Sequence, residues 1–321
     1  GWSFFLNGCG GTLPKTDDRL QVVCTIFPEY DWARQLTQGV DNVDLTLLVK
    51  NGTDLHSYQP SVRDIAMIAR ADVFCYVGGV SDTWVNDVLD TTENRTAQLV
   101  SMAEAADADE EVLAEGMQAE HEHEHEHEHE HHDDENDSHE EPPELDEHVW
   151  LSLRRAALAC TAMKEALCKA DPAHEDIYNQ NCTDYLQKLQ ELDSDFTEMT
   201  SQAARDTIVV ADRFPFRYLA EDYGLTYYAA FPGCSAETEA SFETIVFLSE
   251  KVESLHLPCV LVTEGSNSSL AKTILENAGS DGKILTLQSL QAVSQKEIDA
   301  GVTYLSKMQE NYDVLKQALN S

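Results

Sequence analysis

Alternating histidines and glutamates form the part of this 321-residue sequence whose chemistry is easiest to recognise. Eight histidines stand in one acidic stretch, most of them separated by glutamates: His121, His123, His125, His127, His129, His131, His132 and His139. Imidazole is a donor that zinc, nickel and copper favour, and most of these rings are unprotonated near neutral pH. A charged run is usually only a solvated face, but alternation this regular favours collection of metal ions. A flexible tract offers many equivalent ligand sets, so it predicts a loading or sensing element and not one rigid site.

Two further histidines stand where a folded scaffold would hold them. His56 follows an apolar run and precedes a helical pattern, and His148 lies where the acidic stretch ends and another helical pattern begins. Either one alone would more often be a structural histidine at the surface. Beside a metal-collecting tract, the pair predicts two ligands of one defined metal site.

The cysteines lack the spacing of a thiolate zinc site. Apart from Cys9 there are seven, an odd number with no CxxC pair: Cys24, Cys75, Cys160, Cys168, Cys182, Cys234 and Cys259. We therefore expect them to form no thiolate zinc site. An extracytoplasmic location would permit a disulfide such as Cys168 with Cys182, although spacing does not assign the pairing.

The charge balance limits the possible partners. The chain holds 59 Asp and Glu residues against 21 Lys and Arg residues, a formal charge of −38. Such a chain repels a nucleic-acid backbone, whereas it attracts cations and basic proteins. No uninterrupted apolar run reaches about 18 residues, so we expect no membrane-spanning helix.

The elements that position these residues are predicted by alternating apolar runs and helical patterns. The strand-like runs cover residues 20–27, 43–49, 73–77, 207–211, 225–231, 259–263 and 284–287. Alternation of this kind argues for parallel sheets covered by helices, which bind ligands beyond the carboxyl ends of the strands. We predict an α/β protein with two Rossmann-like lobes and a small-ligand site in the cleft between them.

Two segments interrupt this alternation. Residues 104–147 contain 21 acidic residues and no Lys or Arg, so we expect a disordered loop that cannot form a core. A long polar amphipathic stretch, residues 174–204, would suit a rigid linker helix between the lobes. At the start of the chain, an apolar stretch, a small residue and then Cys9 look like the tail of a lipoprotein signal peptide, with Cys9 as the lipidated residue.

Four motifs carry a resemblance to a known family. They are residues 54–61 (DLHSYQPS), 146–151 (DEHVWL), 218–225 (YLAEDYGL) and 304–311 (YLSKMQEN). In this order they resemble the zinc/manganese solute-binding proteins of ABC importers. The resemblance implies two lobes joined by one long helix and one divalent ion in the cleft, with His56 and His148 as its first two ligands. The implied organisation is a signal remnant and tether (1–19), a first lobe (20–173), a linker helix (174–205) and a second lobe (206–321).

The second lobe departs from the family pattern. The third ligand position falls on Arg213, which stays protonated and has no lone pair to donate, and the fourth falls on Gln288. Three explanations remain open: Asp212 or Glu264 supplies an oxygen and completes a tetrahedral zinc site with water, Arg213 pairs with Glu264 or Glu239, or Arg213 grips the carboxylate of a metal chelator. We favour the oxygen ligand, because an unneutralised arginine about 4 Å from a dication costs several kcal/mol.

The resemblance implies capture of Zn²⁺ outside the cytoplasmic membrane and its delivery to the permease of an ABC importer. We expect a monomer that is periplasmic or held to the membrane by a lipid anchor only. Nitrogen-rich donors favour zinc over Mn²⁺, and Ni²⁺ remains a less favoured alternative. The alternatives are an extracytoplasmic zinc buffer, metallochaperone or adhesin, and binding of a metal-chelator complex through Arg213. A zinc hydrolase is disfavoured, because no His-Glu-x-x-His stands on a credible helix.

Overall fold

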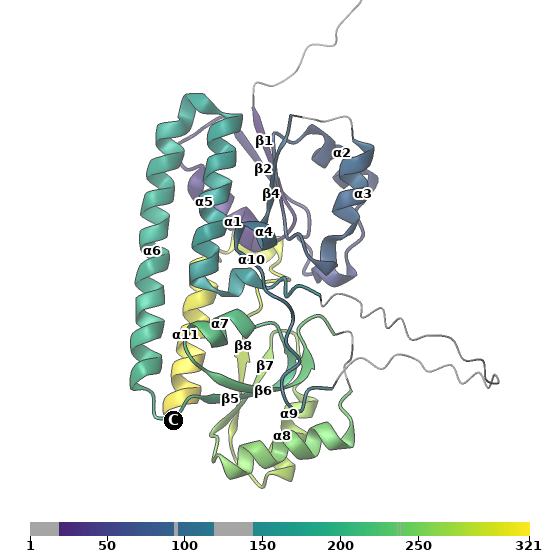
Figure 1. The fold of residues 1–321 in the computed structure, drawn as a ribbon, viewed down its shortest axis with the longest axis vertical. Coiled ribbons are helices and arrows are strands. Elements are labelled where there is room, and N and C mark those ends of the chain that lie inside the picture. Colours follow the sequence, from purple (N-terminus) through teal and green to yellow (C-terminus); the bar gives the residue numbers. More distant parts are fainter. Residues whose placement is uncertain (1–18, 93–95, 119–143, 236, 238) are drawn as a thin grey trace, which may run out of the picture.

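The computed structural model describes residues 19–92, 96–118, 144–235, 237 and 239–321, which form two α/β lobes one above the other (Figure 1). Each lobe contains a four-stranded sheet in which every strand pairs in parallel, in the orders β2-β1-β3-β4 and β6-β5-β7-β8. The predicted class, two parallel-sheet lobes with flanking helices, is confirmed.

The first lobe is built from short strands and from helices on both sides of its sheet. Its elements are β1 (Leu20–Cys24), α1 (Phe27–Leu36), β2 (Val43–Leu47), the 3-10 turn η1 (Leu55–Ser57), α2 (Val62–Arg70), β3 (Val73–Tyr76), η2 (Val80–Asp82), α3 (Trp84–Thr91), β4 (Gln98–Ser101), α4 (Met102–Ala105), η3 (Val149–Leu151) and α5 (Leu153–Ala170).

The second lobe repeats the strand-helix alternation. After η4 (Pro172–His174) and α6 (Glu175–Gln202) come β5 (Thr207–Phe214), α7 (Arg217–Asp222), β6 (Thr226–Pro232), α8 (Phe242–Ser254), β7 (Cys259–Thr263), α9 (Ser269–Asn277), β8 (Lys283–Leu287), α10 (Gln295–Asp299) and α11 (Tyr304–Asn320).

Helix α6 runs beside both lobes, as Figure 1 shows. Its 28 residues, at about 1.5 Å each, make it roughly 42 Å long. One stripe is buried at helical spacing: Tyr178, Cys182, Tyr185, Leu189, Leu192, Phe196 and Met199. This stripe packs with α1 and α5 of the first lobe and with α11 of the second, so the predicted linker helix is present.

Buried hydrogen bonds join the lobes close to His148. The Trp150 indole donates to the Ser289 carbonyl at 2.8 Å, and the Tyr304 hydroxyl donates to the Trp150 carbonyl at 2.5 Å. The Tyr304 ring also meets Trp32 edge-on, with ring centroids 5.1 Å apart. These aromatic side chains belong to one core that extends through both lobes, which fixes the position of the segment that follows His148.

Both ends of the acidic segment have a defined structure, which its composition did not predict. Residues 102–105 are helical, and Glu110 forms a β-bridge with Leu145. Asp146 and Glu147 are buried, although a carboxylate is seldom buried without a partner. The expectation of disorder throughout residues 104–147 is therefore wrong at these two ends, because backbone hydrogen bonds to the folded lobes hold them.

The structure bears differently on three further expectations: the lipidated cysteine with the histidine tract, the disulfide, and the lack of a membrane-spanning helix. Cys9 and the eight histidines of the tract lie outside the described residues. All seven described cysteines are free thiols, including Cys168 and Cys182. Within the described part of the chain, no helix has the length and apolar character that crossing a membrane requires.

Candidate metal centre

Four donor side chains from the two lobes come together at the carboxyl ends of the strands. His56, Glu147 and His148 belong to the first lobe, Cys234 follows β6 of the second, and one donor atom from each lies within 4.8 Å of the others. In a tetrahedral zinc site with bonds of about 2.0–2.3 Å, donor atoms stand roughly 3.3–3.8 Å apart. Closing in by about 1 Å would therefore give this cluster the geometry of a four-coordinate site.

His56 is held in place through its backbone N–H and through one nitrogen of its ring. It lies in η1, where the Asp54 carboxylate accepts a hydrogen bond from its backbone N–H at 3.0 Å. Ring atom Nδ1 is 2.7 Å from the Ser81 hydroxyl of η2. Burial lowers the pKa of His56, against the opposing charges of Asp54 and Glu147, so the ring is neutral and able to donate a lone pair.

The remaining nitrogen of His56 is the strongest sign that a metal belongs here. Nε2 is buried and has no hydrogen-bond partner. It faces the Glu147 carboxylate at 3.7 Å. Because a buried polar atom without a partner costs free energy, an ion at this point would compensate for that cost.

His148 is oriented by the residue two positions before it. Asp146 accepts hydrogen bonds from the His148 backbone N–H at 3.1 Å and from ring atom Nδ1 at 2.8 Å. This pairing places the proton on Nδ1 and leaves the lone pair of Nε2 directed at the cluster, 4.0 Å from the Cys234 sulfur. Burial opposes a charge on His148, but the hydrogen bond and charge of Asp146, with Glu147 and Glu111, raise its pKa above the ordinary value.

Glu147 has a buried side chain that only a glycine neighbour can accommodate. Its carboxylate accepts hydrogen bonds from the Ser81 backbone N–H at 3.2 Å and from the Ser81 hydroxyl. A Cβ at Gly79 would lie 2.4 Å from the same carboxylate. The close approach of η2 therefore fixes Glu147 between His56 and Cys234.

Cys234 contributes the donor from the second lobe. Its thiol donates to the Glu147 carboxylate at 3.4 Å. Burial, followed by the charges of Glu147 and Glu111, raises the pKa of this thiol, so it is protonated before a metal binds. A metal ion would displace this proton and bind the thiolate, and binding would release protons to solution.

Comparison with known proteins fits this geometry. A family model described as ZnuA, the periplasmic component A of the zinc-uptake complex, matches residues 22–318. The chain belongs to this ZnuA family. The zinc-binding lipoprotein AdcA of Streptococcus pneumoniae is 31% identical over 315 residues, which cover 98% of this chain and 58% of AdcA. The chain thus spans less than two thirds of the length of that relative.

Two further comparisons cover nearly the whole length of the matched protein. The high-affinity zinc uptake system protein ZnuA of Bacillus subtilis is 31% identical over 309 residues, covering 96% of this chain and 90% of that protein. The crystal structure of the Zn(II)-bound ZnuA-like domain of S. pneumoniae AdcA is 29% identical with a TM-score of 0.71, and it covers 94% of this chain and 100% of that one. The two-lobed fold is therefore that of a Zn(II)-bound ZnuA-like domain.

In this ZnuA-family chain the partly exposed Arg213 has an anionic partner. A guanidinium nitrogen of Arg213 lies 3.7 Å from the Asp54 carboxylate and donates to the Ser235 carbonyl at 3.4 Å. Asp54, and not Glu264 or Glu239, is thus the ion-pair partner among the described residues. The arginine sits between the loop of His56 and the loop of Cys234 and connects the two lobes.

The two carboxylates favoured as oxygen donors make other contacts. Asp212 accepts from the Thr263 hydroxyl at 2.8 Å and from the backbone N–H of Arg213 at 2.8 Å. Glu264 accepts from the Ser289 backbone N–H at 2.8 Å, and burial raises the pKa of Glu264 despite that bond. Neither belongs to the four-residue cluster.

The remaining predicted second-lobe residues also lie apart from the cluster. Gln288 accepts a hydrogen bond from the Lys307 ammonium group at 3.4 Å. Glu239 is exposed, and its carbonyl accepts from the Gln118 amide. Glu264 and Arg213 do share a cavity of about 340 Å³ in the cleft, together with Asp54 and Gly233.

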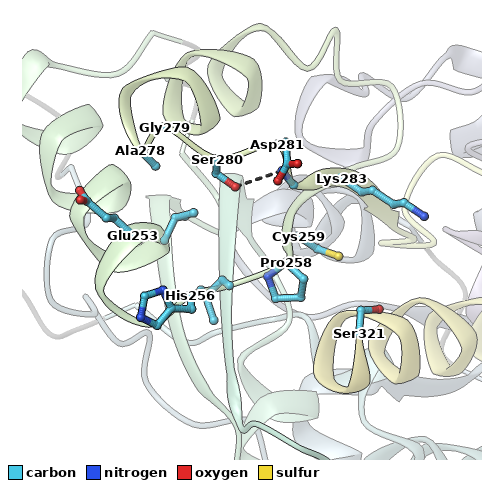
Figure 2. Close-up of a pocket in the computed structure, with 13 residues that line it drawn as sticks. Glu253, His256, Pro258, Cys259, Ala278, Gly279, Ser280, Asp281, Lys283 and Ser321 are labelled. Carbon is cyan, nitrogen blue, oxygen red and sulfur yellow. Dashed lines mark hydrogen bonds between the residues drawn. The ribbon is translucent and has the colours of Figure 1, made fainter.

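A second hollow, of about 620 Å³, lies at the opposite edge of the second sheet (Figure 2). It opens where β7 and β8 begin, next to Cys259 and Lys283, whereas Cys234 and Glu264 follow strand carboxyl ends. Its ionisable side chains, which include Glu253 and His256, form no group of three converging metal donors among the described residues. We therefore place the metal site in the cleft and not in this hollow.

The sequence analysis missed two of the four clustered donors. It expected the cysteines to form no thiolate site because no CxxC pair exists, whereas the structure brings the Cys234 thiol into the cluster with donors from the other lobe. The position of Gly233 and Cys234 directly after a predicted strand was the available signal, since ligands bind at such ends. Glu147 was visible only as the neighbour of His148 in the 146–151 motif.

Proposed function

We propose that this chain captures Zn²⁺ outside the cytoplasmic membrane through His56, Glu147, His148 and Cys234, and that it delivers the ion to the permease of an ABC importer. The observation that carries the proposal is the convergence of four donors around a buried His56 nitrogen that lacks a partner. Membership of the zinc-uptake family supports the same cargo and the partner.

The donor types favour zinc. Two imidazoles, one carboxylate and one thiol match the ligands that Zn²⁺ takes in tetrahedral sites, whereas Mn²⁺ prefers oxygen. Ni²⁺ shares the nitrogen donors but favours square-planar or octahedral geometry. We therefore expect the site to discriminate against Mn²⁺ more strongly than against Ni²⁺.

Four protein donors also favour capture over catalysis. A catalytic zinc keeps a position open for water, whereas a site with four protein ligands is closed. In this cluster the fourth position would be filled by Cys234 of the second lobe. We propose that the chain acts as a solute-binding protein, as a monomer, with Cys9 as its lipid anchor and the histidine tract as a metal-collecting element.

Zinc titration against a competing chelator tests the proposal. His56→Ala combined with His148→Ala should abolish the tightest zinc site, because two of four donors are removed. Deleting residues 119–141 should lower the number of bound ions and keep the tight site. Tight binding that survives the double substitution would refute the assignment, and its loss with the deletion alone would make the tract the receptor.

A further inference from the structure

A segment of the first lobe crosses to the second lobe and contacts the loop that carries Cys234. This segment, residues 109–118, follows α4, and we call it the strap. At its start the Tyr218 hydroxyl of α7 accepts a hydrogen bond from the Asp109 N–H at 2.9 Å and donates to the Asp146 carbonyl at 2.6 Å. Arg217 donates to the Glu110 carbonyl. The second lobe therefore holds both the strap and the residue that orients His148.

The middle of the strap lies against the metal centre and helix α8. The Glu111 carboxylate contacts the backbone N–H of Cys234, and the Glu111 backbone N–H donates to the Glu144 carbonyl at 2.7 Å. Gly116 has a φ of +81°, and a Cβ there would lie 2.2 Å from the Phe247 ring. Only glycine allows the strap to pass this close to α8.

Gln118, at the end of the strap, binds both sides of the Cys234 loop. Its backbone N–H donates to the Ala230 carbonyl of β6 at 3.0 Å. Its side-chain oxygen accepts from the Ser241 N–H at 2.7 Å, at the N-cap of α8. Its side-chain nitrogen donates to the Glu237 carboxylate and, at 3.4 Å, to the Glu239 carbonyl. Cys234 lies between the two anchored points.

The amide chemistry of Gln118 matters because the surroundings are acidic. A carboxylate at this position would face Glu237 with a like charge and would lose both donors. An amide supplies one acceptor and two donors, which the Ser241 N–H, the Glu237 carboxylate and the Glu239 carbonyl use. This match distinguishes Gln118 from a glutamine that merely fills the surface.

We propose that Gln118 is a positioning residue for metal capture, which holds the Cys234 loop so that the thiol meets the three first-lobe donors. The inference rests on the proposed function and assigns a role to a residue outside the cluster. Among the described residues Cys234 is the one clustered donor from the second lobe, so its alignment decides whether the site closes. Loss of a hydrogen-bond partner of a metal ligand lowers metal affinity about 10- to 100-fold. Gln118 contacts the loop of Cys234 and not Cys234 itself, so we expect an effect at the lower end of that range.

Cobalt titration of the full chain separates this role from simple folding. Co²⁺ bound by a thiolate absorbs through a charge-transfer band, and the Cys234→Ser variant identifies which part of the absorption belongs to Cys234. We expect Gln118→Ala to bind Co²⁺ about 10-fold more weakly, with the thiolate band still present at saturation. The double exchange Gln118→Glu with Glu237→Gln restores the pairing of these two side chains in reverse, without the bond to the Glu239 carbonyl, and should restore part of the lost affinity. The exposed residue Gln190 of α6 provides the matched control, Gln190→Ala.

A double-mutant cycle decides whether Gln118 acts through Cys234. In the Cys234→Ser background, Gln118→Ala should cause no further loss of affinity. An equal loss in that background, wild-type affinity of Gln118→Ala, or failure of the exchange to restore binding would each overturn the inference. His56→Ala distinguishes the two proposals: if it and Cys234→Ser weaken binding while Gln118→Ala does not, only the role of the strap is wrong.

Discussion

Asp146 offers a sharp test of the metal centre, because it orients His148 without being one of the four clustered donors. Asp146→Ala removes both hydrogen bonds from the His148 ring and backbone, whereas Asp146→Asn keeps an acceptor oxygen and removes only the charge. The two variants therefore separate orientation of the ring from its electrostatic support.

The expected loss follows from the contacts. Each hydrogen bond to a charged acceptor contributes about 1.5–3 kcal/mol. Removing the partner of a metal-binding histidine lowers affinity about 10- to 100-fold, which corresponds to about 1.4–2.8 kcal/mol. We expect zinc affinity to fall about 100-fold in Asp146→Ala. In Asp146→Asn we expect a fall of about 10-fold, because the asparagine still fixes the ring.

The same carboxylate also affects the pH dependence. Burial disfavours the charged form of His148, but the hydrogen bond and charge of Asp146, with Glu147 and Glu111, raise its pKa. A raised pKa extends proton competition to higher pH, so wild-type zinc affinity rises as pH increases through that pKa. In Asp146→Asn the charge that raises the pKa of His148 is gone, so burial lowers that pKa. Zinc affinity should then depend less steeply on pH near neutrality.

Competition with a chromophoric zinc chelator between about pH 6 and about pH 8 measures both effects. Thermal unfolding of the metal-free proteins controls for folding. Affinities of Asp146→Ala within a factor of about two of wild type would refute the reasoning, because His148 would then bind without its support or not bind at all. A pH profile of Asp146→Asn as steep as that of wild type would refute the electrostatic part.

Four further outcomes follow from the structure. Cys234→Ser should weaken zinc binding more than Mn²⁺ binding, since it removes the one soft donor, and parallel calorimetry with both metals checks this. It should also release fewer protons on binding, because the thiol is protonated beforehand, and calorimetry in buffers of different ionisation enthalpy counts them. Arg213→Ala should change zinc affinity by less than about fivefold, because its 3.7 Å ion pair with Asp54 is partly exposed, and a larger effect in the chelator assay would place the arginine at the ion. Tyr304→Phe removes the buried bond to Trp150 and should lower the free energy of unfolding by about 1 kcal/mol, as chemical denaturation would show.

Much of the fold was predictable because local patterns determine it. The seven strand-like runs correspond to strands β1–β3 and β5–β8, since a buried parallel strand shows as a continuous apolar run. Strand β4, with the sequence QLVS, was missed. It has four residues and a half-exposed pattern at a sheet edge, which leaves little periodic signal.

The candidate site was predictable only in its first-lobe part. His56 and His148 carry a local sequence context, and the structure places their ring centroids 6.1 Å apart. Cys234 lies 86 residues after His148 in the sequence and joins the pair through a contact between the two lobes. Neither spacing nor composition reveals such a contact. Asp212 illustrates the converse. The sequence offered it as an oxygen ligand next to Arg213, whereas its carboxylate accepts hydrogen bonds from Thr263 at the end of β7.

Among the described residues, three of the clustered donors come from one lobe and one from the other. This unequal division would set the order in which a bound ion makes and breaks its bonds. With an ion held by these four donors, a motion that separates the lobes would break a single metal bond, the one to sulfur. The ion would remain bound to three donors with one vacant coordination position. An incoming donor on an acceptor protein could occupy that position before the other bonds break. Transfer would then proceed by ligand exchange, and the ion would pass between proteins without becoming fully hydrated.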